Sequence, residues 1–448
     1  MKIKPLITVC LLTAVSIAST LQAESLIDIY RLAVDNDPKF LSSGALLEAN
    51  TERGNQALSA LLPQLSGNYN SSYNRSGSST PTFTNFFGAS TGSESGRDSL
   101  SLTLNQSIYD YSTWVNYGQA QKRVEQAKVR YQSNQQELIV RVAQVYLDVL
   151  GAKDNLAFAG AEQEAIKQEL EQTKQRYDVG LIAITDVHEA QARYDLSEAD
   201  RIRAKNRLEN ADEALREVTG QYHDTLDILN INIPLVSPEP ARIEDWVQVA
   251  RESNLNVIAT NMDVYIAQQD IKRRFGGHLP NVSLSASYSD STTNPAGIDV
   301  DTDSYSVSGS INVSIPIYSG GLTNYQVKEG EALYKKSTFD LESAMRETIR
   351  TTRSSYLGVG ASISGIKALQ QSVLSQESAL EATQAGFEVG TRTIVDVLLS
   401  TRSLYSAKSQ LATARYDYIL AILKLKQAAG ILTSDDLLEV NKWMTKAN

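Results

Sequence analysis

The stretch Phe387–Val397 reads F-E-V-G-T-R-T-I-V-D-V, and a close copy of it, Tyr177–Val187, reads Y-D-V-G-L-I-A-I-T-D-V. Each copy lies between two long polar segments that are rich in alanine. In each, a glycine (Gly180 or Gly390) follows a run with helical periodicity. A glycine just past a helix end adopts the left-handed conformation that ends the helix. Each copy therefore predicts a helix end, a tight turn and a second helix, which together form the tip of a helical hairpin.

A threonine precedes the second helix of each predicted hairpin, Thr185 in the first copy and Thr393 in the second. The side-chain oxygen of a threonine at this position accepts a hydrogen bond from the first turn of the helix. Asp396 follows Thr393 by three residues, a spacing that resembles a capping box, although aspartate is shorter than the usual glutamate. We therefore expect both threonines to cap the helices that leave the tips.

The first 23 residues have the composition of a secretory signal peptide. Lys2 and Lys4 supply a positive amino-terminal region, and an apolar run from 6 to 18 follows. We place cleavage after Ala23, and Cys10 lies too early in the apolar run to be a lipidated cysteine. Cleavage would move the net charge from −10 to −12 and remove the single cysteine, so the mature chain could form no disulfide.

Beyond the signal, no apolar run reaches the roughly 18 residues that a membrane helix needs. The acidic balance argues against a nucleic acid partner. An exported chain of this kind remains compatible with a periplasmic protein, a secreted protein or an outer-membrane β-barrel.

Helical periodicity dominates the rest of the chain. We expect helix over residues 24–62 with a break at Asp37-Pro38, a helix of about 100 Å over 113–179 if Gly151 and Gly160 do not interrupt it, and a helix that ends at Gly220. The last helix carries Leu404, Leu411, Tyr418 and Leu425 at seven-residue spacing, with small alanines between them. This spacing indicates closely packed, supercoiled helices.

Four segments alternate between apolar and polar residues, as strands do. They cover about 64–74, 99–108, 282–289 and 306–315, and serine or asparagine fills nearly every position of one face. Strands of about 9 to 11 residues with one apolar and one polar face suit an outer-membrane barrel with lipid outside and water inside. A soluble sheet of two hairpins is the alternative, and the four strands together behind a signal peptide favour the membrane.

Four strands cannot close a barrel alone. Open sheet edges cannot face lipid, because each backbone group without a hydrogen bond costs several kcal/mol there. About eight strands are the practical minimum for closure, so the barrel must be shared between chains. Two chains would give 8 strands and three would give 12, and the sequence pattern leaves this choice open.

The same order of predicted helices and strands occurs twice along the sequence. We expect a signal peptide at 1–23, a first helix–strand–strand–helix repeat at 24–220, a connector at 221–240, a second repeat at 241–429 and a carboxyl-terminal segment at 430–448. The predicted fold class is thus an α+β membrane protein with an internal two-fold repeat.

The chain resembles the TolC family of outer-membrane efflux and type I secretion channel proteins over its whole mature length. The resemblance rests on the two tips and on three further motifs, Leu62-Pro63-Gln64-Leu65, His278-Leu279-Pro280 and Ile315-Pro316-Ile317-Tyr318-Ser319-Gly320-Gly321. It implies a homotrimer with a 12-stranded barrel in the outer membrane, a long α-helical barrel that projects into the periplasm, and an equatorial collar to which the connector and the tail contribute. It also implies a periplasmic adaptor protein and an inner-membrane pump of RND, ABC or MFS type as partners.

The same resemblance implies a gate at the tips, which open by an iris-like uncoiling. Arg392 would bond the Thr185/Asp186 tip of a neighbouring helix pair, and Asp396 would form a ring of carboxylates at the entrance. Two positions depart from the family pattern, because Leu399 replaces a second acidic ring and Phe387 replaces a tyrosine that locks the tip. The adaptor would contact the tips at Val179, Gly180, Leu181, Val389, Gly390 and Thr391. Simpler interpretations are that both aspartates complement helix dipoles and that Arg392 is a solvated charge.

The sequence offers little that would support catalysis. His188, His223 and His278 lie far apart without metal-ligand spacing, and we expect no metal and no cofactor. The residues 88–92 match G-x-S-x-G, but they lie in a loop between strands, whereas that motif needs a strand-to-helix turn. We therefore expect a passive exit duct and not an enzyme. The alternatives are a periplasmic coiled-coil adaptor or scaffold, and a secreted esterase that uses Ser90.

Overall fold

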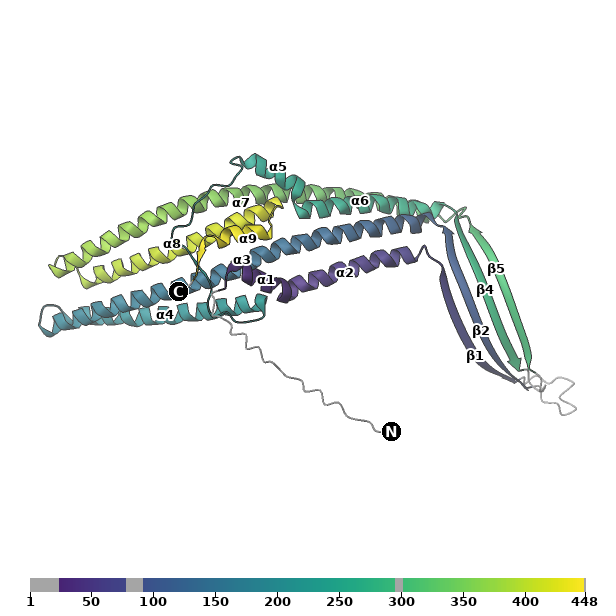
Figure 1. Cartoon of the computed structure of the whole chain (residues 1–448), viewed down its shortest axis with the longest axis horizontal. Helices are drawn as coiled ribbons and strands as arrows, with labels where there is room; N and C mark the ends of the chain where they lie inside the picture. The colour runs from purple at the N-terminus through teal and green to yellow at the C-terminus, as the bar shows by residue number, and fades with distance from the viewer. Residues whose placement is uncertain (1–23, 78–91, 295–300, 447–448) are drawn as a thin grey trace, which may run out of the picture.

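The computed structural model describes residues 24–77, 92–294 and 301–446. The predicted signal peptide and nearly all of the G-x-S-x-G motif lie outside these residues. The molecule is elongated, with a four-stranded sheet at one end and two helical hairpin tips at the other (Figure 1). Two very long helices, α3 (Tyr111–Asp178) and α7 (Leu322–Glu388), run from the sheet to the tips.

The helices follow the predicted pattern closely. α3 runs without interruption through Gly151 and Gly160, and its 68 residues span roughly 100 Å. The predicted break at Asp37-Pro38 is confirmed, because Asp37 ends one helix and its carboxylate accepts from the backbone N–H groups of Lys39 and Phe40 at the start of the next. The other helices are α1 (Leu26–Asn36), α2 (Pro38–Ser59), α4 (Ile184–Thr219), α5 (Ile243–Ser253), α6 (Leu255–Phe275), α8 (Ile394–Ala429) and α9 (Ser434–Asn441).

The sheet is antiparallel in the order β1-β2-β4-β5. Its strands are β1 (Gln64–Gly77), β2 (Gly92–Tyr109), β4 (Asn281–Asn294) and β5 (Thr302–Ser314). At 13 to 18 residues they are longer than the predicted 9 to 11. The prediction stopped where the apolar alternation stops, whereas backbone pairing continues through polar residues, as between Ser76 and Ser93.

The two faces of the sheet differ as the alternation predicted. Serine hydroxyls of β4 and β5 pair across the strands, at 2.8 Å for Ser285 with Ser310 and 2.8 Å for Ser287 with Ser308. Apolar side chains that alternate with the polar ones are exposed, such as Val307 of β5 at 74% and Leu65 of β1 at 72%. Apolar side chains this exposed indicate a surface that water does not normally cover.

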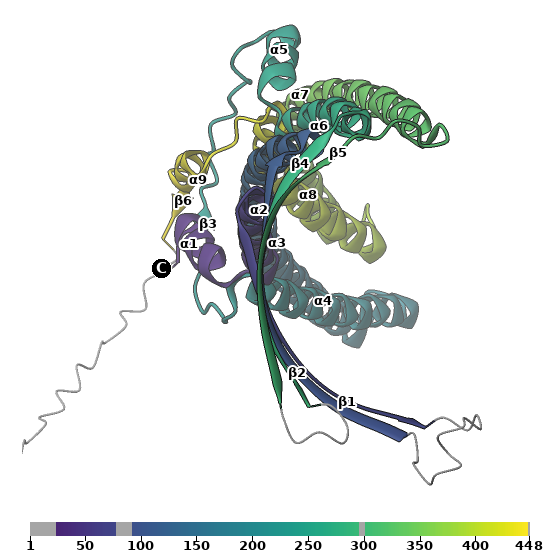
Figure 2. The same ribbon diagram turned by 90° about the vertical axis from the view of Figure 1, so that its right-hand side faces the viewer.

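A compact layer packs against one side of the long helices, at the middle of the molecule. It contains α1, α5, α9 and a short sheet of β3 (Ile228–Leu229) and β6 (Met444–Thr445), which lie on the convex side of the arc of sheet and long helices (Figure 2). The main hydrophobic core lies here, around the fully buried Tyr146 and Tyr418. The Tyr146 hydroxyl donates to the backbone carbonyl of Asp227 at 2.8 Å, and the Tyr418 hydroxyl accepts from the backbone N–H of Val236 at 2.8 Å.

In the described part of the chain, no helix is both long enough and apolar enough to pass through a membrane.

Candidate functional site

The two hairpin tips have the same backbone geometry. Gly180 and Gly390 have φ angles of 78° and 80°, which confirms the left-handed turn predicted after each helix. The backbone N–H of Gly180 donates to the Tyr177 carbonyl at 2.8 Å, and that of Gly390 donates to the Phe387 carbonyl at 3.1 Å. A Cβ would meet nothing within 4 Å at either glycine, so the positive φ alone accounts for the glycine.

The helix starts after the two tips differ. Thr393 caps α8 as predicted: its hydroxyl accepts from the Asp396 backbone N–H at 3.3 Å, and the Asp396 carboxylate accepts from the Thr393 backbone N–H at 2.9 Å. The hydrogen bonds from Thr393 hold the pKa of the Asp396 carboxyl below its usual value. The prediction for Thr185 is wrong, because α4 begins at Ile184 and its N-cap is Ala183.

An alignment of the two copies explains the error. Ala183 occupies the position of Thr393, and Thr185 occupies that of Val395. The two tip loops have the same length, so the cap position is fixed by its distance from the glycine. Thr185 lies in the first turn of α4, where its side chain is exposed, and Asp186 beside it is half-buried.

The outermost residues of the tips are apolar and exposed. Val179, Leu181 and Val389 are 70%, 72% and 75% exposed, and the neighbouring Gly180, Gly390 and Thr391 are also exposed. Leu399 lies one turn into α8 and is 46% exposed. An apolar end this exposed, on helices that are otherwise polar, indicates a surface for another protein.

Behind the tips, the two hairpins share a small hydrophobic core, hereafter the tip core. It joins residues of α3, α4, α7 and α8, and Phe387 is its aromatic member. The predicted gate residue Phe387 is thus 7% exposed and packs into the tip core. The buried members of the tip core are Ile166, Leu170, Ala190, Phe387, Ile394, Val397 and Leu398.

Sequence reasoning missed Arg176, in the last turn of α3. Its guanidinium carbon lies 4.3 Å from the centroid of the Phe387 ring, and its Nη1 donates to the Phe387 carbonyl oxygen at 3.3 Å. Arg392, in contrast, makes no ion pair within the described residues of the chain. Its Cγ passes over Gly386, where a Cβ would lie 2.8 Å from it. Comparison of the two copies could have drawn attention to Arg176, because the matching position of the second copy is Gly386.

A polar seam continues along α3 away from the tip core, with contacts at seven-residue intervals. The Glu169 carboxylate accepts a hydrogen bond from the Gln384 side chain at 3.3 Å. Glu162 and Arg402 line a common cavity, together with Phe158 and Arg207. The Asn155 side-chain oxygen accepts a hydrogen bond from the Ser409 hydroxyl. Burial raises the pKa of the Glu162 and Glu169 carboxyls. The hairpins therefore contact each other through polar side chains between two hydrophobic regions, the core at the middle of the molecule and the tip core.

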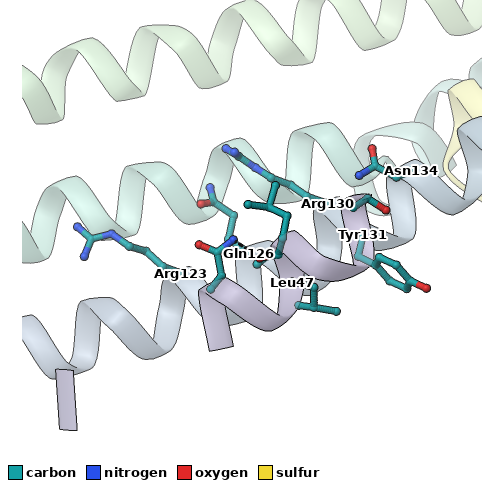
Figure 3. A pocket seen from close by; sticks show the side chains of 10 residues that line it. Leu47, Arg123, Gln126, Arg130, Tyr131 and Asn134 are labelled. Atoms are coloured by element: carbon teal, nitrogen blue, oxygen red, sulfur yellow. Dashed lines mark hydrogen bonds between the residues drawn. The ribbon is translucent and has the colours of Figure 1, made fainter. Parts of the chain in front are cut away.

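A separate pocket lies between residues 43–50 of α2 and residues 123–134 of α3 (Figure 3). Gln126 reaches from α3 to the Ala259 carbonyl of α6 at 2.7 Å, and the Tyr131 ring packs 5.2 Å from that of Phe40. The side chains around this pocket connect neighbouring helices, and none of the predicted site residues lines it. Over the residues that the structure describes, no group of three His, Cys, Asp or Glu side chains could hold a metal ion.

A sheet with an apolar outer face, continued by two long helical hairpins, is the architecture of an outer-membrane channel. The Campylobacter jejuni CmeC outer membrane channel shares the fold, with a TM-score of 0.73, 15% sequence identity and coverage of 94% of this chain and 90% of that one. Outer membrane protein TolC of Vibrio cholerae is 40% identical over 95% of each chain. The alkaline protease secretion protein AprF of Pseudomonas aeruginosa is 30% identical over 93% of this chain and 86% of that one. The family model described as "Outer membrane efflux protein" matches residues 29–221 and 246–431.

The chain belongs to the outer membrane efflux protein family. It is an outer-membrane exit channel, and this family consists of channel proteins and not of enzymes.

Proposed function

We propose that three copies of this chain form a continuous duct, with a 12-stranded barrel in the outer membrane and a helical barrel in the periplasm. The observation that carries the proposal is that a sheet with one apolar and one polar face lies at one end of the molecule and two apolar hairpin tips lie at the other (Figure 1). Four strands per chain require three chains for 12 strands, and the edge strands β1 and β5 are free to pair with a neighbouring copy.

The domain plan follows from the order of the elements. Helices, two strands and two long helices occur in that order in both 24–220 and 241–429, which supports an internal repeat. The connector 221–240 and the segment 430–448 contribute β3 and β6 to the layer around the middle of the molecule, which we assign as the equatorial collar. The signal peptide at 1–23 would direct the chain through the inner membrane.

The tips close the periplasmic entrance, and they open by an iris-like uncoiling. Arg392 bonds Thr185 and Asp186 of a neighbouring copy, and Asp396 places one ring of carboxylates at the entrance. The exposure of Thr185 and the absence of an ion pair for Arg392 within the described chain support this role. Phe387 and Leu399 shape the closed tip through apolar contacts instead of through a hydroxyl and a second acidic ring.

The exposed tip residues bind a periplasmic adaptor, which connects the duct to an inner-membrane pump of RND, ABC or MFS type. Val179, Leu181 and Val389 offer the apolar surface, Gly180 and Gly390 let the partner approach the backbone closely, and Thr391 adds an exposed polar side chain beside them. Because AprF is named for the secretion of alkaline protease, protein cargo is part of the proposal together with small molecules. An adaptor or scaffold role for the chain itself is disfavoured by the lipid-patterned sheet.

Single-channel conductance of Arg392→Ala in planar bilayers tests the gate. Loss of a hydrogen bond to a charged group costs about 1.5–3 kcal/mol, so the ratio of open to closed channels should rise at least about tenfold. Arg201→Ala is the matched control, because Arg201 is an exposed arginine on α4, distant from the tips. Equal conductance in the Arg392→Ala variant and the wild type would refute the lock, and a wild-type protein that forms no pore would refute the duct.

A further inference from the structure

We propose that Arg176 is a further gate residue, which ties the two hairpin tips of one chain together through Phe387. This inference rests on the proposed function of the tips as a gate. Arg176 belongs to the last turn of α3 and Phe387 to the last turn of α7, 211 residues later in the chain. The contact therefore joins the first hairpin to the second at their ends.

Two independent contacts define the tie. The guanidinium lies over the Phe387 ring, with its carbon 4.3 Å from the centroid, and it also donates to the Phe387 carbonyl oxygen at 3.3 Å. The ring is 7% exposed, so the cation–π contact is shielded from water and is stronger than one on an open surface. The carbonyl lies at the carboxyl-terminal end of α7, where the helix dipole favours a positive charge.

Only arginine satisfies both contacts from this position. A guanidinium is planar, so it stacks on a ring and directs its N–H groups outward in the same plane. A lysine ammonium is a compact point charge that can approach the ring or the carbonyl but lacks the flat surface to stack. The tie should therefore be sensitive to an Arg176→Lys change that preserves the charge.

The two copies of the tip sequence place their arginines differently. Arg176 matches Gly386, and Arg392 matches Ile182. Because Gly386 lacks a side chain, the stem of Arg392 lies close against its backbone, and no second arginine occupies the position on α7 that matches Arg176. We assign Arg176 to the contact within a chain and Arg392 to the contact between chains. Opening then requires the loss of both.

The experiment uses the full mature chain in detergent and in bilayers, with the variants Arg176→Gln, Arg176→Lys, Phe387→Leu and Phe387→Tyr. Lys174→Gln is the matched control, because Lys174 lies in the same part of α3 and pairs with Glu171 of its own helix. Hydrogen exchange across 177–183 and 387–393 reports the tie directly, whether or not the protein conducts.

We expect exchange at both tips to rise about tenfold in Arg176→Gln, which loses both contacts, and less in Phe387→Leu, which loses the ring but keeps the backbone carbonyl. A double variant of Arg176→Gln with Phe387→Leu should rise no further than Arg176→Gln alone, since the arginine takes part in both contacts. Phe387→Tyr keeps the ring and should exchange as the wild type does, with Arg176→Lys in between. The open probability of single channels should rise in the same order.

Unchanged exchange in Arg176→Gln would overturn the tie itself. Faster exchange with wild-type conductance would overturn its role in the gate, because loss of the tie would then leave the channel closed as before. A failure of the duct is distinguishable from both results, since the wild-type protein would then give no channels at all.

Discussion

A single methyl group at Gly430 should destabilise the layer around the middle of the molecule. Gly430 ends α8 with a φ of 77°, and a side chain in that left-handed conformation costs about 1–2 kcal/mol. A Cβ would also overlap the carbonyl of Ser253 and lie 2.7 Å from the Cα of Asn254, at the junction of α5 and α6. These are backbone atoms, so relief requires a backbone shift that costs about 1–3 kcal/mol more.

Hydrogen bonds at the same turn join the end of α8 to α3 and to the residue between α5 and α6. The Gln136 side chain donates to the carbonyls of Gly430 and Leu432 at 3.1 and 3.0 Å, and the Asn254 side chain donates to the Ala428 carbonyl at 2.9 Å. A backbone shift at Gly430 would weaken these bonds as well. We therefore expect Gly430→Ala to lower the free energy of unfolding by about 2–5 kcal/mol.

Tryptophan fluorescence during urea unfolding measures the effect. Trp246 is 4% exposed and donates to the Pro240 carbonyl, and the Trp443 ring stacks on Tyr418, so both report on this layer. Gly360→Ala is the control, because Gly360 lies within α7 with nothing within 4 Å of a Cβ, and alanine there should stabilise the helix by about 1 kcal/mol. Equal unfolding midpoints for Gly430→Ala and the wild type would refute the reasoning.

Two further predictions concern buried charges. Asp37→Ala should lower the free energy of unfolding by about 3–5 kcal/mol, because it removes the cap of α2 and leaves the half-buried Arg141 with only the exposed Glu137, at 3.6 Å, as a carboxylate partner. Urea unfolding would measure this, and Asp340→Ala, which breaks an exposed pair with Lys336, should cost less than about 1 kcal/mol. Burial raises the pKa of the Glu169 carboxyl, so the folded protein binds a proton at this group more tightly than the unfolded chain does. The free energy of unfolding should therefore fall as the pH rises from the ordinary glutamate pKa of 4.5 through the raised pKa of the folded state. Glu169→Gln should make the unfolding midpoint depend less on pH, whereas the control Glu171→Gln, at an exposed position, should leave the dependence unchanged. The same dependence in Glu169→Gln and in the wild type would contradict its assignment to Glu169.

Local patterns in the sequence determined the hairpins, their turns and the four strands. The glycine turns at 180 and 390, the cap at Thr393 and the alternation of serine with apolar residues depend on neighbours within a few positions, so they can be read from the chain itself. The helix break at Asp37-Pro38 is of the same kind. The cap prediction at Thr185 is wrong because the true N-cap, Ala183, lies two residues earlier, and its position depends on the loop length that the alignment with the second tip reveals.

The tertiary structure decided which distant residues meet. The pairing of Arg176 with Phe387, the polar seam from Asn155 to Glu169 and the junction at Gly430 each join segments more than 150 residues apart. No local periodicity encodes such a contact, because it depends on how the helices lie against one another in the packed molecule. The strand ends also extended beyond the prediction, since backbone hydrogen bonds continue where the side-chain pattern stops. The local sequence therefore determines the helices, strands and turns, because capping and periodicity depend on a few neighbouring residues. Tertiary packing determines which of these elements contact each other, because burial depends on the whole chain.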